Sequence, residues 1–167
     1  MSYNECESAV ATLLQSLDRF GDDQVTRGDD RAIDLMLRNR PSGVANTDNV
    51  AILYPGVFQL IEQSQNRYTW HWHIQVWLLY KYQIPSDNAA ATWTQFRAMR
   101  QDVIDQIKKY PQLNQTAAEI HLVELRADTE PEEIFRELPA PGQKKKPDYI
   151  GQRIVVMVEE MEDVTYG

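Results

Sequence analysis

The sequence predicts an α+β fold in which two helices pack on one face of a mainly antiparallel sheet of about four strands. Three observations support this prediction: two segments with apolar residues at helical spacing, one long segment of alternating apolar residues, and three shorter β-prone runs. Their order is helix, two strands, helix, two strands, so two hairpins could bury both helical stripes in a two-layer sandwich. With 167 residues, 43% of them hydrophobic, we expect one domain over residues 1–167.

The first predicted helix runs from Asn4 to Phe20. Ser2 and Glu5 are spaced as a capping box before it, and Gly21 is placed to end it. The apolar residues at helical spacing are Val10, Leu13, Leu14 and Leu17. This pattern predicts one helical face turned towards a core.

Residues 22–49 are predicted to form an irregular arm or interface segment. Acidic and basic side chains alternate there around a short apolar patch at residues 33–37. Long irregular segments are uncommon inside compact domains unless they contact something else. The basic residues that we expect to face a partner are Arg31, Arg38 and Arg40.

The clearest strand signal is the alternation from Tyr68 to Tyr82. The side chains on one face are Tyr68, Trp70, Trp72, Ile74, Val76, Leu78, Tyr80 and Tyr82. Core packing is the favoured interpretation of this stripe, because a base-stacking platform would need more basic neighbours than Arg67 and Lys81. The other face is polar at its start and apolar towards its end. A preceding strand is predicted to begin near Gly56, after Pro55, with a turn at residues 63–66.

The second half of the chain predicts a helix and two more strands. The helix is expected to start after Ser86 or Asp87 and to end near Tyr110, because Pro111 follows. Strands are predicted at residues 118–127 and 150–161. Between them, residues 128–149 are predicted to form an extended, exposed loop. Its basic cluster is a second candidate interface, made of Lys144, Lys145 and Lys146.

Charge and cysteine content narrow the expected functions. Twenty-five acidic against 17 basic residues give a net charge of −8, which disfavours gripping nucleic-acid phosphates. A single cysteine, Cys6, allows no intrachain disulfide, so we expect a reducing compartment and a packing role for this residue. The first residues lack signal-peptide features and no apolar run is long enough to span a membrane, so we expect no membrane association.

Residues that could carry chemistry are few. His71 and His73 lie two apart on one strand face, and His121 on another strand could add a third metal ligand. The alternative is that all three lie on a half-exposed sheet face without a metal. The adjacent acidic pairs at residues 132–133 and 159–160 are interpreted as solvated charges. With no nucleophile motif and no phosphate-binding glycine loop, we expect no catalytic residues, cofactor or metal.

Four segments, in order, resemble the tail-terminator (tail completion) proteins of long-tailed bacteriophages. The segments are Tyr54–Phe58, Trp70–Leu78, Ile107–Leu113 and Arg153–Met161. They resemble, in turn, a proline-led strand, an aromatic-rich strand, a helix ending before a Pro-x-Leu turn, and a closing strand. The resemblance covers residues 49–161, and residues 22–49 and the lysine-containing loop depart from the shorter members of the family.

The resemblance implies a structural virion protein of the tail and neck, assembled in the host cytoplasm. It implies a hexameric ring that sits on the last ring of tail-tube protein, ends tube polymerisation and presents a surface to the head or neck connector. DNA would pass through the ring without specific binding, and like charge suits such sliding. Two alternatives stay open: another head-to-tail connector or neck ring component, and a small metal-dependent enzyme built around His71, His73 and His121.

Overall fold

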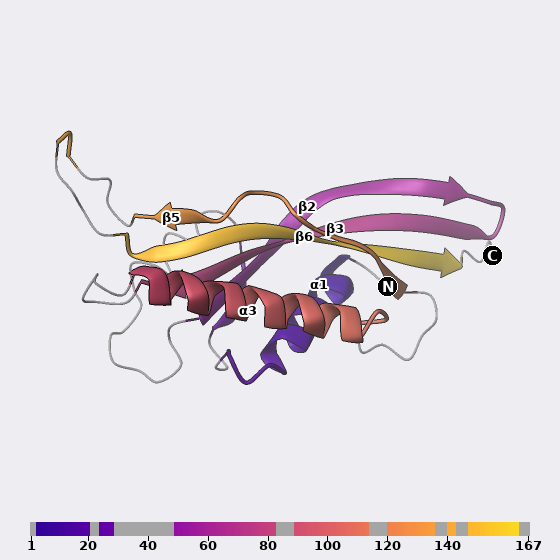
Figure 1. Ribbon diagram of the computed structural model, residues 1–167. Helices are drawn as coiled ribbons and strands as arrows, with labels where there is room; N and C mark the ends of the chain where they lie inside the picture. Colours follow the sequence, from indigo (N-terminus) through magenta and orange to yellow (C-terminus); the bar gives the residue numbers. More distant parts are fainter. Residues whose placement is uncertain are drawn as a thin grey trace.

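The computed structural model describes residues 3–20, 24–28, 49–82, 89–113, 120–135, 140–142 and 147–163. Over these residues the fold is α+β, with two helices and a mixed sheet of six strands (Figure 1). The predicted fold class is therefore confirmed. The predictions of about four strands and of the order helix, two strands, helix, two strands are wrong. The two unpredicted strands have three residues each, which is too short to leave a periodic pattern in the sequence.

The sheet is built around three strands of 15 residues each. The elements are α1 (Tyr3–Gln15), β1 (Val25–Arg27), β2 (Asn49–Gln63), β3 (Arg67–Lys81), α3 (Ala89–Lys109), β4 (Ile120–Ala127), β5 (Glu132–Ile134) and β6 (Tyr149–Asp163). The strand order is β1-β2-β3-β6-β4, and β5 also pairs with β6. Only β1 and β2 are parallel among the described pairs. Strand β3 occupies one edge of β6 along the whole length of β6. Strands β4 and β5 therefore both pair with the other edge of β6, one after the other.

The main core lies between the sheet and the two helices, which cover the same face (Figure 1). Ile74, Val76 and Leu78 of β3 point into it, as the alternation predicts, and are fully buried. From the helices the core takes, among others, Leu13, Leu14, Phe96, Met99, Val103 and Ile107. The apolar stripes of both helices are thereby removed from water, which is the main driving force for this packing.

A smaller cluster lies on the opposite face of the sheet. It contains Val50, Ile52, Leu79 and Tyr149, with Trp77 and Ile134 packed against it. This cluster is where the second face of β3 becomes apolar, as the sequence predicts. Both faces of the sheet are thus buried near the start of β2 and the end of β3.

Two predicted boundaries are wrong. Strand β2 begins at Asn49 and continues through Pro55 and Gly56, with a register shift between Pro55 and Phe58. The proline is tolerated because β1 pairs only with residues 51–53, so Pro55 lies on an edge where no described strand needs its N–H. Helix α1 ends at Gln15 and not at Phe20, and the chain continues in turns such as Leu17 N to Leu14 O (3.1 Å). Ser2 and Gly21, the predicted cap and stop, lie outside the described residues.

The two predicted irregular segments both contain a strand. Within residues 22–49, Val25–Arg27 pairs with β2, and residues 29–48 lie outside the described residues, so the prediction of an arm or interface segment stays a prediction. Within residues 128–149, Glu132–Ile134 pairs with β6. Residues 128 and 129 also donate backbone hydrogen bonds to Arg153 O. Both strands form by pairing with residues distant in the sequence, so a local sequence pattern does not predict them.

Candidate functional site

The six basic residues predicted to face a partner are Arg31, Arg38, Arg40, Lys144, Lys145 and Lys146. All six lie outside the described residues. The described surface points instead to a different region, which we call the projecting hairpin: residues 56–72, the end of β2 and the start of β3.

The projecting hairpin extends beyond both helices (Figure 1). The cause is a difference in length: strands of 15 residues reach roughly 50 Å at about 3.3 Å per residue. Helix α3, with 21 residues, covers only about 31 Å at about 1.5 Å per residue. The burial of β2 changes accordingly, from buried at residues 50–54 to exposed at residues 58–63.

Apolar side chains are exposed on the β2 side of the projecting hairpin. Val57 and Phe58 are 66% and 65% exposed, and Leu60 and Ile61 are 39% and 45% exposed. They account for four of the five large exposed hydrophobic residues in the described part of the chain, Val123 of β4 being the fifth. A cluster of this kind on one element of an acidic, charged protein is typical of a surface that another molecule covers.

Four aromatic rings join these residues to the rest of the sheet. Trp70 and Trp72 are stacked, with centroids 5.4 Å apart, and Phe58 lies 5.6 Å from Trp72 and 6.2 Å from Trp70. Tyr68 lies 6.5 Å from Trp70. Trp70 is further fixed by donating from Nε1 to Glu162 Oε2 (3.2 Å). The predicted core role of the aromatic stripe is therefore confirmed from Trp72 onwards, where Trp72 packs half-buried against the main core, whereas Tyr68 and Trp70 are half-buried outside it.

The projecting hairpin was not among the surfaces predicted from the sequence. The signal was present in Val57–Ile61, where four of five residues are apolar and the alternation of a half-buried strand is absent. An apolar run without alternation indicates a strand covered on both faces. In the described part of the chain, Val57, Phe58, Leu60 and Ile61 are instead exposed.

A polar cluster lies on the face of the sheet opposite the helices. Glu159 of β6 is paired in register with His71 of β3 and His121 of β4. Its two carboxylate oxygens lie 2.7 Å from His71 Nε2 and 3.2 Å from His121 Nε2. The carboxylate can thus accept one contact from each imidazole across three neighbouring strands.

The predicted histidine trio is only partly brought together. His71 and His121 contact the same carboxylate, whereas His73 lies beside Met157 in the register. Burial lowers the pKa of His73 below its usual value, and the positive charge of Arg126 lowers it further. Within the residues that the structure describes, no group of three or more His, Cys, Asp or Glu side chains is arranged to hold a metal ion.

The interpretation of Glu159 and Glu160 as solvated charges is wrong. Glu159 contacts two histidines, and Glu160 is only 1% exposed, on the helix-covered face. Cys6 of α1 donates to Glu160 Oε2 across 3.4 Å. Burial, followed by the nearby Glu160 carboxylate, raises the pKa of Cys6 to about 12. The thiol therefore stays protonated at neutral pH and is a packing residue, not a nucleophile.

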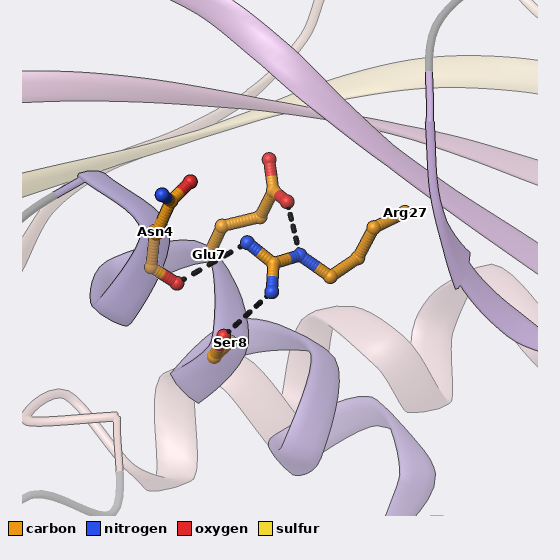
Figure 2. A network of polar contacts seen from close by, with 4 residues as sticks. All are labelled: Asn4, Glu7, Ser8 and Arg27. Carbon is orange, nitrogen blue, oxygen red and sulfur yellow. Dashed lines mark hydrogen bonds and ion pairs between the residues drawn. The ribbon is translucent and has the colours of Figure 1, made fainter.

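Arg27 of β1 fastens helix α1 to the sheet. Its guanidinium reaches three groups on the first turns of α1, as Figure 2 shows. Nε donates to Glu7 Oε1, Nη1 to Ser8 Oγ (2.9 Å) and Nη2 to Asn4 O (3.3 Å). Glu7 is 4% exposed, so this ion pair is largely shielded from water on the carboxylate side. Strand β1 has only three residues, and this contact attaches it to α1 in addition to its pairing with β2.

The described chain has no helix both long and apolar enough to cross a membrane. No family model and no curated protein sequence matches this chain.

Proposed function

We propose that this chain is a non-catalytic structural subunit of a ring that caps the tail tube of a long-tailed bacteriophage. The ring would end tube polymerisation and join the tail to the head or neck connector. The single observation that carries this proposal is the projecting hairpin, whose exposed apolar residues extend beyond the helices. The resemblance of residues 49–161 to tail-terminator proteins supplies the kind of assembly.

The projecting hairpin has the properties of an assembly contact. Val57 and Phe58 are each about two-thirds exposed, and covering such side chains stabilises an assembly by roughly 25 cal/mol per Å² of apolar surface removed from water. The outer edge of β2 beyond residue 53 is paired with no described strand, and an edge of this kind is a template for pairing with another chain. We assign the hairpin to the contact with a second copy of this chain.

A contact between the hairpin of one copy and a different surface of the next is heterologous. Such contacts generate a closed ring when the rotation between copies divides a full turn. The net charge of −8 supports a channel through which DNA passes, because an acidic lining repels the duplex and lets it slide. The remaining partners in this proposal are the tail-tube protein and the head or neck connector.

Electron microscopy of phage particles tests the proposal. Deleting the coding sequence from a phage genome that carries it should give tails of uncontrolled length. Tails of normal length that remain unjoined to heads would instead identify another neck or connector ring, which is the first alternative. Particles with normal, joined tails would contradict both.

A metal-dependent enzyme is the second alternative, and the contacts of His71 and His121 with Glu159 are the observation that bears on it. Mass spectrometry of the purified protein for zinc, iron and manganese discriminates between this alternative and a structural ring. A stoichiometric metal that is lost in a His71→Ala variant would favour the enzyme. Absence of all three metals would remove it.

A further inference from the structure

A pocket of about 350 Å³ lies between helix α3 and the β4 edge of the sheet. Its apolar walls are Ile104 of α3, Leu125 of β4 and Ile154 of β6. Pockets that hold small molecules have volumes from about 300 Å³ upwards, so this one is large enough for a small ligand. It shares no residue with the projecting hairpin.

The charged residues that line this pocket are all basic. They are Arg100 and Lys108 of α3 and Arg126 of β4, and no Asp or Glu is part of the lining. This is unusual in a chain with a net charge of −8. Arg126 pairs in register with Val155 and so lies on the His73 side of the sheet, which leaves Arg100 and Lys108 as the two cations on the α3 side. Arg126 has an acidic partner in Glu124, with its Nε 3.6 Å from Oε1. Among the described residues, no carboxylate lies within ion-pair distance of Arg100 or Lys108.

Neutral groups hold Arg100 in place. Its Nη1 donates to Gln152 Oε1 (3.0 Å), and the Gln152 Nε2 donates to Thr129 O (2.8 Å). Gln152 is 5% exposed, so its amide orientation is fixed by buried contacts. The bond to Gln152 uses one of the five N–H donors of the guanidinium, which also lies 5.9 Å from the centre of the Phe96 ring, and no described carboxylate is within ion-pair distance of it.

We propose that this pocket binds an oxyanion, a carboxylate or a phosphate, carried on an apolar group. Arg100 and Lys108 would contact the oxyanion. Hydrogen bonds from a guanidinium or ammonium group to a carboxylate or phosphate are charge-assisted and stronger than bonds between neutral groups. Ile104, Leu125 and Ile154 would contact the apolar part. This inference does not depend on the proposed ring.

Two-dimensional ¹H–¹⁵N NMR of the full chain tests the pocket with three probes. Phenylphosphate and phenylacetate carry the two oxyanions on an aromatic ring, and phenol is the neutral control. We expect saturable shifts of the amides of Arg100, Ile104 and Gln152 with at least one of the two anions. Which anion binds more tightly distinguishes a phosphate site from a carboxylate site.

Helix α3 offers a matched pair of variants. Arg100→Gln with Lys108→Gln removes both pocket cations, whereas Arg97→Gln with Lys109→Gln makes the same charge change at residues that do not line the pocket. The first pair should weaken anion binding about tenfold or more. The second pair should change it less than about twofold. Lys108→Gln alone, which removes no described hydrogen bond, should weaken it in the same direction if the double variant unfolds.

Three results would overturn the proposal. One is the absence of saturable shifts at the pocket amides with either anion up to about 20 mM, the range of very weak binding. Another is equal weakening by the two pairs of variants, which would indicate general charge attraction. A third is binding of phenol as tight as that of the anions.

Discussion

Gly56 lies where the backbone of a neighbouring strand leaves no room for a side chain. A Cβ there would lie 2.6 Å from His73 O, a backbone atom in the middle of the sheet that cannot move aside easily. We predict that Gly56→Ala lowers the free energy of unfolding by about 1–3 kcal/mol, because the strands must separate locally. Gln59→Ala, on the exposed part of the same strand, should change it by less than about 0.5 kcal/mol. Urea unfolding measures both, and equal stability of the two variants would contradict the tight register at Gly56.

The Arg27 contact with α1 should matter more than a similar pair on the surface. Glu7 is 4% exposed, and Arg27 reaches it and two other groups of α1. We predict that Arg27→Ala destabilises the protein by about 1–3 kcal/mol, because it leaves a buried carboxylate without its guanidinium neighbour.

Arg67 provides the matched control for Arg27. Its Nε lies 2.9 Å from Asp163 Oδ1, and both side chains are more than half exposed. Arg67→Ala should therefore cost less than about 1 kcal/mol, as is usual for surface pairs. Thermal or urea unfolding measures the loss of stability in both variants. A larger loss in Arg67→Ala than in Arg27→Ala would show that burial does not decide the strength of these contacts.

Cys6 makes stability depend on pH in the alkaline range. Burial and Glu160 raise its pKa from the ordinary value of 9.0 to about 12. The unfolded thiol loses its proton near pH 9 while the folded thiol keeps it, so the unfolded state binds fewer protons above that pH. The stabilising contribution is therefore complete below pH 9 and is lost progressively as the pH rises from 9 to about 12. We predict that Cys6→Ala has a flatter stability curve than the wild type in this window. The free energy of unfolding of both proteins is measured by urea unfolding at several pH values between 9 and 12. An equal decrease with pH in the two proteins would contradict the raised pKa of Cys6.

At the scale of elements, the projecting hairpin carries the assembly prediction. Phe58 is 65% exposed, so Phe58→Asp should leave the isolated subunit folded but weaken its association with a second copy. The gain of a charge in a contact that excludes water should weaken association about tenfold or more. Sedimentation velocity measures the association, and circular dichroism checks the fold.

Gln59 gives the control for Phe58. It is also exposed, but it pairs in register with His71 and so lies on the opposite face of the hairpin from Phe58. Gln59→Asp should leave association within about threefold of the wild type. An equal loss in both variants would place the contact elsewhere or make it a general effect of added charge.

The elements that the sequence predicted well are the long ones. Helix α3 and strand β3 repeat their periods over 21 and 15 residues, so their patterns are unambiguous. Strands β1 and β5 have three residues each and are held by pairing with β2 and β6, so no local pattern marks them. The predicted start of β2 near Gly56 is too late, because Pro and Gly are typical of strand boundaries. In the structure, Pro55 and Gly56 lie at a register shift within β2.

At the scale of the whole molecule, the projecting hairpin is exposed because the strands of the sheet are longer than the helices that cover it. The sequence predicts the strand and the helix separately, whereas the overhang depends on the difference between their lengths of roughly 50 Å and 31 Å. The difference places Trp70 and Trp72 at the rim of the helical layer, so that one aromatic stripe is core at one end and surface at the other. The burial of Glu160 could not be predicted either, because it depends on α1 lying over the end of β6.

The proposed ring requires that the apolar surface of the projecting hairpin be covered by further copies of the chain. Native mass spectrometry of the purified protein, with and without tail-tube protein, tests this most directly. We expect a single closed assembly, a hexamer by the family resemblance, formed alone or on addition of tail-tube protein. A monomer at all concentrations and in both conditions would contradict it.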